Sequence, residues 1–278
     1  METALKREYK AKLLLFGEYT VLQNGVALAV PLEKYYGQWK TDYGDQQLDS
    51  FFAFLNKLDF IDTARLKSYM HKALRFDSNI PQGYGLGSSA ALTAAAYKLF
   101  GLSGLDQSAD SLLKRLGLME NHFHGQSSGF DPLCSYLDRP VLKKEGEIYV
   151  LEDFVLPQNL FLLDSCRKRD SEKMIAVFKR KTGDAVFNSI LKELDSTNRS
   201  AIQNLQKGHK EHFLNDFRRI SEIQFKNFEE MIPSHIANIW SKGLKGNDSY
   251  LKLSGAGGGG YFMGIGRYAN NKNISYLS

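Results

Sequence analysis

Residues 80–101 read Ile-Pro-Gln-Gly-Tyr-Gly-Leu-Gly-Ser-Ser-Ala-Ala-Leu-Thr-Ala-Ala-Ala-Tyr-Lys-Leu-Phe-Gly. Three alternating glycines are followed by two serines and an alanine-rich run: Gly83, Gly85, Gly87, Ser88 and Ser89. Glycine reaches backbone angles that other residues avoid, and it lets a ligand approach the main chain closely. Alanine is the best helix former. The stretch therefore predicts a glycine loop and a helix over residues 90–100, capped by one of the two serines and ended by Gly101.

A glycine loop that leads into a helix N-terminus is a candidate anion site. Free N–H groups and the positive end of the helix dipole point at one spot, which suits a polyphosphate. The spacing is not the Walker pattern, since no Lys-Ser/Thr pair follows Gly87, and no apolar strand leads into the loop as in the dinucleotide fingerprint. A tight turn that merely requires glycine is the alternative interpretation.

Length and composition limit the class of protein. The chain has 278 residues, 43% of them hydrophobic, which suits one large or two ordinary domains. Its net charge of +5 is spread among acids, which argues against a nucleic-acid partner and suits anionic substrates. Two cysteines exclude a disulfide scaffold and indicate a reducing compartment. Without an apolar leader or a run of ~20 apolar residues, we expect a cytoplasmic protein with no membrane partner.

The glycine loop is the second of three stretches that resemble the motifs of the GHMP kinases (galactokinase, homoserine kinase, mevalonate kinase and phosphomevalonate kinase). The first stretch is Lys12-Leu-Leu-Leu-Phe-Gly-Glu-Tyr19, followed by Gly25-Val-Ala-Leu-Ala29. The last is Tyr250-Leu-Lys-Leu-Ser-Gly-Ala-Gly-Gly-Gly-Gly-Tyr-Phe-Met-Gly264. Glycine runs are often linkers, but this one lies between two apolar strand-like segments. Tyr19 stands where mevalonate kinases usually carry histidine, and Ala11 stands where a glycine is common.

Residues 120–131 also resemble the mevalonate kinase branch. That branch has Glu, then His-Gly, then Pro-Ser-Gly-x-Asp, and here Glu120 and Asp131 have its spacing of eleven positions. Ser127 replaces the proline. Considered by itself, Asp131 could be a loop acid or a helix cap. His122 and His124 could be a metal pair, but no third ligand stands at zinc spacing.

The resemblance implies an α+β fold of two domains. Residues 1–157 would form the ATP-binding domain, similar to domain 2 of ribosomal protein S5, and residues 158–278 a ferredoxin-like α/β sandwich. The residue pattern predicts strands at 9–16 and 35–43, a hairpin of 21–22 and 26–30 about Asn24-Gly25, and a charged hairpin over 140–155. It predicts helices at 46–59, 63–76, 106–125, 172–181, 185–206, 209–230 and 233–244, and strands on both sides of the last glycine run, with a frayed tail from Gly266.

The resemblance also implies roles for individual residues. Asp131 would accept or orient the proton of the substrate hydroxyl, and Lys12 would lie beside it and stabilise the charge on the transferring group. Ser89 and Glu120 would hold Mg²⁺. The ATP phosphates would contact Gly83, Gly85, Leu86, Gly87, Ser88, Ser89 and Ala90. The substrate would contact Glu18, Tyr19, Arg169, Ser254, Gly255 and Ala256, although a charge run such as Arg167–Arg169 is often a solvated surface.

The function implied is that of an ATP-dependent small-molecule kinase that phosphorylates an alcohol. Mevalonate is the first choice of acceptor because of the Glu-to-Asp spacing, His124-Gly125 and the turn over residues 164–174, and this would place the protein in isoprenoid precursor synthesis. Phosphomevalonate is second, because Gly-Phe-Asp at 129–131 resembles that branch. A diphosphomevalonate decarboxylase and a non-catalytic sensor of nucleotides or sugars are further alternatives. We expect a monomer or a homodimer.

Overall fold

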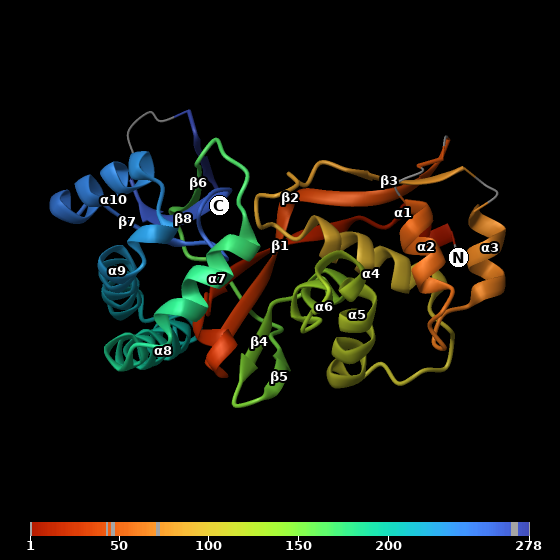
Figure 1. Ribbon diagram of the computed structural model, residues 1–278, viewed down its shortest axis with the longest axis horizontal. Coiled ribbons are helices and arrows are strands. Elements are labelled where there is room, and N and C mark those ends of the chain that lie inside the picture. Colours follow the sequence, from red (N-terminus) through yellow and green to blue (C-terminus); the bar gives the residue numbers. More distant parts are fainter. Residues whose placement is uncertain (1, 43, 46–47, 71–72, 268–271, 278) are drawn as a thin grey trace.

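The fold combines helices with two antiparallel sheets, as expected for the α+β class, in a computed structural model that describes residues 2–42, 44–45, 48–70, 73–267 and 272–277. The first sheet holds β1 (Tyr9–Phe16), β2 (Ala27–Thr41), β3 (Leu74–Ser78), β4 (Val141–Lys144) and β5 (Glu147–Val150). The second holds β6 (Leu160–Asp164), β7 (Ser249–Leu253), β8 (Tyr261–Gly266) and β9 (Ile274–Tyr276). The two sheets occupy opposite halves of the molecule, joined where β1 and β2 run across its middle (Figure 1).

The β1–β2 hairpin is the centre of the first sheet. β2 pairs with β1, β3 and β4, and β4 pairs with β5 in the predicted charged hairpin. Asn24 does make the turn, with a left-handed φ of 59°. Val21 and Leu22, however, belong to a 3-10 turn, η1 (Thr20–Gln23), and not to a strand. The strands predicted at 26–30 and 35–43 are one continuous strand, β2, although Tyr43 lies outside the described residues.

Helix α4 (Ser88–Phe100) lies at the core of the N-terminal half. It packs against β1 and β2 and against α5 (Ala109–His124) and α6 (Phe130–Leu137), and its alanines are buried because their small side chains allow close approach. Beyond it lie α1 (Glu2–Lys6), α2 (Asp49–Leu55) and α3 (Thr63–Met70). The predicted helix 63–76 is therefore too long, since residues 74–76 belong to β3. Gln46 and Gln47, placed in a predicted helix, lie outside the described residues.

Helix α6 was not predicted, and it carries Asp131 in its first turn. It begins after Gly129, whose φ is +75°. Pro132 does not disrupt it because proline is tolerated in the first helical turn. Helix α5, which ends just before, begins three residues later than expected because Ser108 caps it by accepting from the Ser111 N–H.

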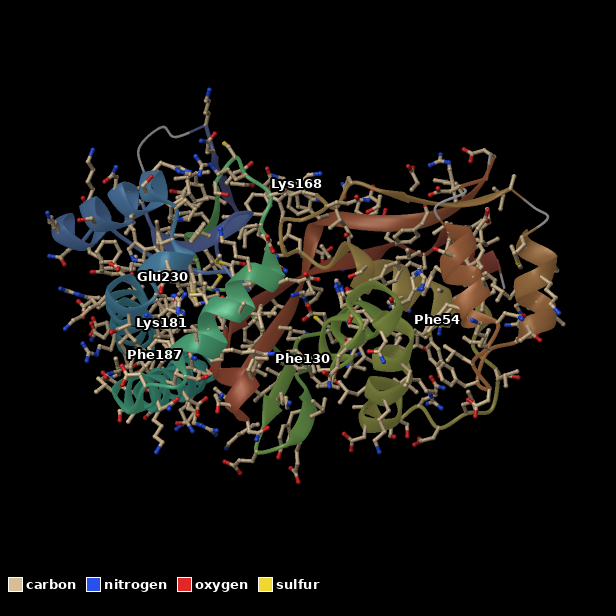
Figure 2. The ribbon with its side chains drawn as sticks, in the orientation of Figure 1. Phe54, Phe130, Lys168, Lys181, Phe187 and Glu230 are labelled. Atoms are coloured by element: carbon tan, nitrogen blue, oxygen red, sulfur yellow. The ribbon has the colours of Figure 1, made fainter. Side chains whose placement is uncertain are left out.

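The C-terminal half packs helices on one sheet of order β7-β8-β6-β9. Its helices are α7 (Ser171–Lys181), α8 (Ala185–Gln206), α9 (Lys210–Asn227), the short η3 (Glu229–Met231) and α10 (Ser234–Gly246). Lys181 at the end of α7 pairs with Glu230 and lies 5.0 Å from the Phe187 ring centre, which ties α7 to η3 and α8 (Figure 2). A frayed tail was predicted from Gly266, but Ile274–Tyr276 pair with β6, so the prediction is wrong for this part of the tail.

The chain passes from one sheet to the other between β5 and β6. A division of the chain into domains at residues 157 and 158 would fall in this connection, and it stays a prediction. Among the residues that the structure describes, no helix combines the length and the apolarity needed to cross a membrane.

A first prediction tests the start of α6. A Cβ added to Gly129 would meet the Leu113 carbonyl oxygen at 2.0 Å in a backbone conformation that disfavours side chains. We expect Gly129→Ala to lower the free energy of unfolding by about 3 kcal/mol or more, measured by urea denaturation. Gly104 has a similar φ of +79° and open space around it, so Gly104→Ala should cost only about 1 kcal/mol. Equal losses in the two variants would contradict the close contact between α5 and α6.

Candidate active site

The glycine loop has the backbone that an anion site requires. Gly83, Gly85 and Gly87 have φ values of +79°, +87° and +73°, which favour glycine. Gly87 is the N-cap of α4 and no side chain caps this helix, so neither Ser88 nor Ser89 is the predicted cap. The first N–H groups of a helix have no partner within the helix. They are therefore available at the end of the loop.

Three distant stretches hold this loop through its main chain. The Lys12 N–H on β1 donates to the Leu86 carbonyl at 3.0 Å, and the Arg169 N–H donates to Gly83 at 3.0 Å. The Tyr261 N–H at the start of β8 donates to the Tyr84 carbonyl at 3.4 Å. The first, second and last glycine-containing motifs thus meet at one place, together with the basic turn before α7.

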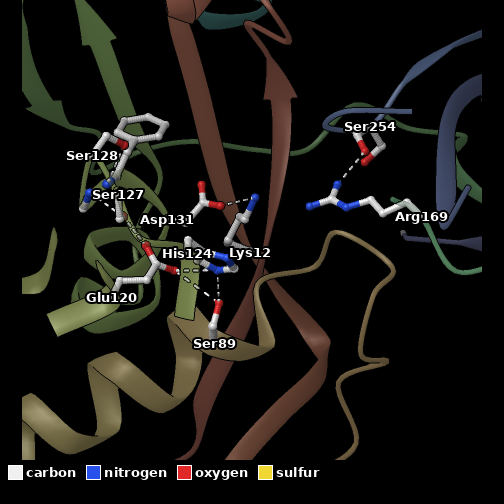
Figure 3. A network of polar contacts seen from close by, with 11 residues as sticks. Lys12, Ser89, Glu120, His124, Ser127, Ser128, Asp131, Arg169 and Ser254 are labelled. Atoms are coloured by element: carbon white, nitrogen blue, oxygen red, sulfur yellow. Dashed lines mark hydrogen bonds and ion pairs between the residues drawn. The ribbon is translucent and has the colours of Figure 1, made fainter. Parts of the chain in front are cut away.

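Lys12 and Asp131 form an ion pair beside the loop. The Lys12 ammonium lies 2.5 Å from the Asp131 carboxylate (Figure 3). The lysine side chain is buried, whereas the Asp131 side chain is 37% exposed. A Cβ on Gly87 would lie 3.0 Å from the Lys12 Cγ, so the lysine stem passes directly over the loop. The pair therefore presents a carboxylate to solvent next to the candidate anion site.

Ser89 and Glu120 meet on the other side of Asp131. The Ser89 hydroxyl donates to Glu120 at 3.3 Å, and the Ser127 hydroxyl donates to the other carboxylate oxygen at 2.5 Å. Ser127 replaces the proline of the branch and thus supplies a hydrogen bond. Burial raises the pKa of Glu120 to about 7, and the negative charge of Asp131 adds to this. A buried carboxylate next to another acid is a favourable partner for a cation.

His124 and His122 do not form a pair. His124 Nε2 is 2.9 Å from the Ser89 hydroxyl, and burial lowers the pKa of this imidazole. His122 packs between the rings of Phe51 and Phe54, with centroid distances of 5.3 Å to each. Apart from a possible metal pair with His122, no site role was predicted for His124, although it lies four residues after Glu120, which is one helical turn.

The donor set at Ser89 and Glu120 fits Mg²⁺. A hydroxyl and a carboxylate are hard oxygen ligands, and magnesium in phosphate sites commonly takes one or two protein carboxylates with phosphate and water oxygens for the rest. No group of three or more His, Cys, Asp or Glu side chains suited to a metal occurs within the described ranges. A metal ion at Ser89 and Glu120 would therefore need ligands other than protein side chains, such as phosphate and water oxygens.

Arg169, the last of the three basic residues in the turn, is directed into the site (Figure 3). A Cβ on either Gly85 or Gly255 would come within 2.3 Å of its guanidinium, so this group lies between the two glycine loops. It donates to the Ser254 carbonyl at 3.5 Å and faces Lys12 and Asp131 (Figure 3). Burial lowers the pKa of Arg169. Lys168 instead lies along the outside of Gly83, on the segment that leads into α7 (Figure 2).

Comparison with known proteins agrees with this arrangement. Residues 54–139, which include the loop, α4, α5 and Asp131, match the GHMP kinases N terminal domain. A mevalonate kinase of Pyrococcus abyssi is 25% identical over 294 aligned positions, which cover 90% of this chain and 85% of that protein.

The chain matches the GHMP kinase family over residues 54–139 and resembles a mevalonate kinase over most of its length.

It is therefore a small-molecule kinase, in a family that uses ATP. Solved structures of GHMP kinases share its fold. The L. major mevalonate kinase in complex with R-mevalonate has a TM-score of 0.68 at 16% identity, covering 94% of this chain and 87% of that one. The Streptococcus pneumoniae phosphomevalonate kinase in complex with phosphomevalonate and AMPPNP has a TM-score of 0.69 at 15% identity and covers 98% of both chains.

In this kinase, Glu18 and Tyr19 are turned toward the last glycine loop. The Tyr19 hydroxyl donates to the Ala256 carbonyl at 2.5 Å, and its ring stacks on Phe178 at 4.6 Å. The Glu18 side chain was expected at the substrate but is fully buried, paired with Lys252 at 2.5 Å. No role was predicted for Lys252, because a lysine in a strand is usually exposed.

A second prediction concerns Glu120 in the unliganded protein. Its pKa rises from 4.5 to about 7 on folding, so the folded state binds the proton more tightly and stability falls as the pH rises from 4.5 to 7. We expect Glu120→Gln to raise the free energy of unfolding by about 1–3 kcal/mol at pH 8 and hardly at all at pH 4.5. Urea denaturation at both pH values measures this.

The exposed Glu229 provides the matched control, since Glu229→Gln changes an acid that solvent surrounds. An unchanged stability of Glu120→Gln at pH 8 would contradict the buried, proton-binding state of Glu120.

Proposed function

We propose that this kinase transfers the γ-phosphoryl group of ATP to the alcohol of mevalonate, a step of isoprenoid precursor synthesis. The Lys12–Asp131 pair carries the proposal, because it puts an accessible carboxylate at 2.5 Å from a buried ammonium beside the glycine loop. The likeness to a Pyrococcus abyssi protein named mevalonate kinase, over 90% of the chain, supports this acceptor. Two free cysteines, Cys134 and Cys166, suit a cytoplasmic location.

Phosphoryl transfer mainly requires positioning and neutralisation of charge. The N–H groups at the start of α4 would bind the phosphates of ATP. Asp131 would accept the proton of the attacking hydroxyl, and the Lys12 ammonium would stabilise negative charge on the transferring group. Ser89 and Glu120 would hold magnesium, which, when bound, neutralises phosphate oxygens.

Arg169 supports an anionic acceptor. Its guanidinium is half-enclosed between Gly85 and Gly255, and among the described residues no carboxylate is paired with it. Arginine binds carboxylates and phosphates through two parallel N–H groups. The carboxylate of mevalonate would meet this requirement, with its alcohol toward Asp131.

Phosphomevalonate is the second candidate acceptor, because the same guanidinium also suits a phosphate and because Lys168 and Arg167 extend the positive charge outward from Arg169. A phosphate nucleophile needs less help from a base than an alcohol does. With phosphomevalonate as the acceptor, turnover would therefore depend less on Asp131 as a base.

A panel of acceptors distinguishes these functions. We expect ADP release from Mg-ATP with mevalonate, and little with phosphomevalonate, diphosphomevalonate, homoserine or sugars. Release with phosphomevalonate alone would replace the proposal by its second candidate. Carbon dioxide from diphosphomevalonate would indicate a decarboxylase, and bound ATP without turnover on any compound would indicate a sensor.

A further prediction tests Asp131 as the base. We expect Asp131→Asn to lower turnover about 100-fold or more, since loss of a general base typically has this effect, while the affinity for ATP stays nearly unchanged. Steady-state ADP release and calorimetric titration with ATP measure the two quantities.

The control is the neighbouring Lys10–Asp138 pair, at 3.1 Å, which joins the same strand to the other end of α6. Asp138→Asn should leave turnover close to that of the wild type. If Asp131→Asn kept more than about a tenth of the activity, Asp131 would not be the base.

A further inference from the structure

A buried ion pair joins the two halves of the molecule directly beneath the last glycine loop. Glu18 follows β1, and Lys252 lies on β7 in the other sheet. Their charged groups are 2.5 Å apart, and both side chains are wholly inaccessible to solvent. The Lys252 ammonium also lies 5.8 Å from the ring centre of Phe16. Neither residue reaches the open part of the site, so neither can touch a substrate in this arrangement.

Stability alone does not explain this pair. Removing two charges from water is costly, and a buried ion pair is often no more stabilising than apolar residues of the same volume. The cost is visible here, because the second carboxylate oxygen of Glu18 has no hydrogen-bond partner in the part of the chain described. Burial also raises the pKa of Glu18 and lowers that of Lys252, which means that both charges are disfavoured.

The contacts of the pair lead to the glycine loop. The Lys252 ammonium donates a second hydrogen bond, at 2.8 Å, to the carbonyl of Leu253. The main chain of Gly255 lies close enough to Glu18 to favour its ionised form. The next residue, Tyr19, donates to the Ala256 carbonyl. The end of the first motif is thus joined to the beginning of the last glycine loop.

The loop in turn positions Arg169. The carbonyl of Ser254 accepts the hydrogen bond of its guanidinium, and Gly255 lies against the same group (Figure 3). A shift of this main chain by 1 Å would therefore move the cation that faces Asp131. Misplacement on this scale can reduce the rate of an enzyme about 100-fold.

We propose that the Glu18–Lys252 pair is a positioning device for phosphoryl transfer, which fixes the main chain at 253–255 and, through it, Arg169. This role rests on the proposed function, since it assigns the pair to the arrangement of the same site. Glu18 and Lys252 are positioning residues and not catalytic ones.

The double variant Glu18→Gln/Lys252→Met tests the proposal. It removes both charges together, so no unpaired charge stays buried, and its melting temperature should lie near that of the wild type. Either single variant leaves one group without its partner and should melt roughly 10 °C lower. In the double variant we expect kcat to fall roughly 10- to 100-fold, with the Kd for ATP within about threefold of the wild type.

Hydrogen exchange measures the loop without any substrate. The N–H groups of Gly258 and Gly260 are bonded to the carbonyls of Met231 and Arg167. We expect the amides of residues 254–260 to exchange faster in the double variant than in the wild type. If the double variant did not fold, Glu18→Gln/Lys252→Gln, which also removes both charges but keeps polar groups at both positions, would carry the same readouts.

Asp195 provides a matched control. Its carboxylate accepts from the Val26 N–H at 2.7 Å and so ties the connection after β1 to α8, away from the glycine loop. Asp195→Ala should lower the melting temperature and leave kcat and loop exchange unchanged well below melting.

A double variant with the kcat and loop exchange of the wild type would overturn the proposal, as would a loss of kcat in Asp195→Ala equal to that of the double variant. If the wild type phosphorylated no acceptor, the proposed function would fail, but loop exchange would still decide whether the pair holds the loop.

Discussion

The site depends on how the glycine loop before α4 is held. The carbonyls of Gly83, Tyr84 and Leu86 in this loop accept hydrogen bonds from three other parts of the chain. One of these parts is Gly260-Tyr261, where a Cβ on Gly260 would come within 2.7 Å of the Tyr84 carbonyl. Glycine is therefore required at this position, because the main chains of the two glycine runs are in contact.

The charged groups around the loop are separated by sign, with Glu120 and Asp131 on one side and Lys12 and Arg169 on the other (Figure 3). Lys12 lies beside Asp131, Glu120 lies on the far side of that aspartate, and Arg169 faces it from the C-terminal half. Burial disfavours charge on both Glu120 and Arg169, so each is most stable when an opposite charge is added nearby. A magnesium ion would meet the first need and an anionic acceptor the second. Under the proposed function, binding of both would offset the cost of burying these two charges.

Local features of the fold could be predicted from the sequence, and features set by tertiary pairing could not. The alanine-rich helix after the glycine loop and the long amphipathic helix 185–206 follow from propensity and periodicity, and both are present. Helix α6 was missed because Gly129 and Pro132 are typical of a turn. The strand β3 was read as helix because residues 74–76 continue an apolar spacing, whereas pairing with β2 decides their conformation.

The same limit applies to the site. Lys12, Ser89, Glu120 and Asp131 could be named through the resemblance, and the structure brings them together. Their roles in catalysis stay predictions. Lys252 could not be identified, since alternation along a strand does not tell a buried lysine from an exposed one without its partner. Its partner lies 234 positions away in sequence, so only the pairing of the two halves reveals the contact.

The replacement of histidine by Tyr19 has a structural consequence for substrate recognition. The Tyr19 ring packs between Phe178 and Phe228, and its hydroxyl donates a hydrogen bond to the Ala256 carbonyl. A hydroxyl already bonded to the main chain has one donor fewer to offer a substrate. Tyr19 and the buried Glu18, at the end of the first motif, therefore both support the last glycine loop. Under the proposed function, recognition of the acceptor would then fall to Arg169, whose guanidinium contacts the Ser254 carbonyl of that loop.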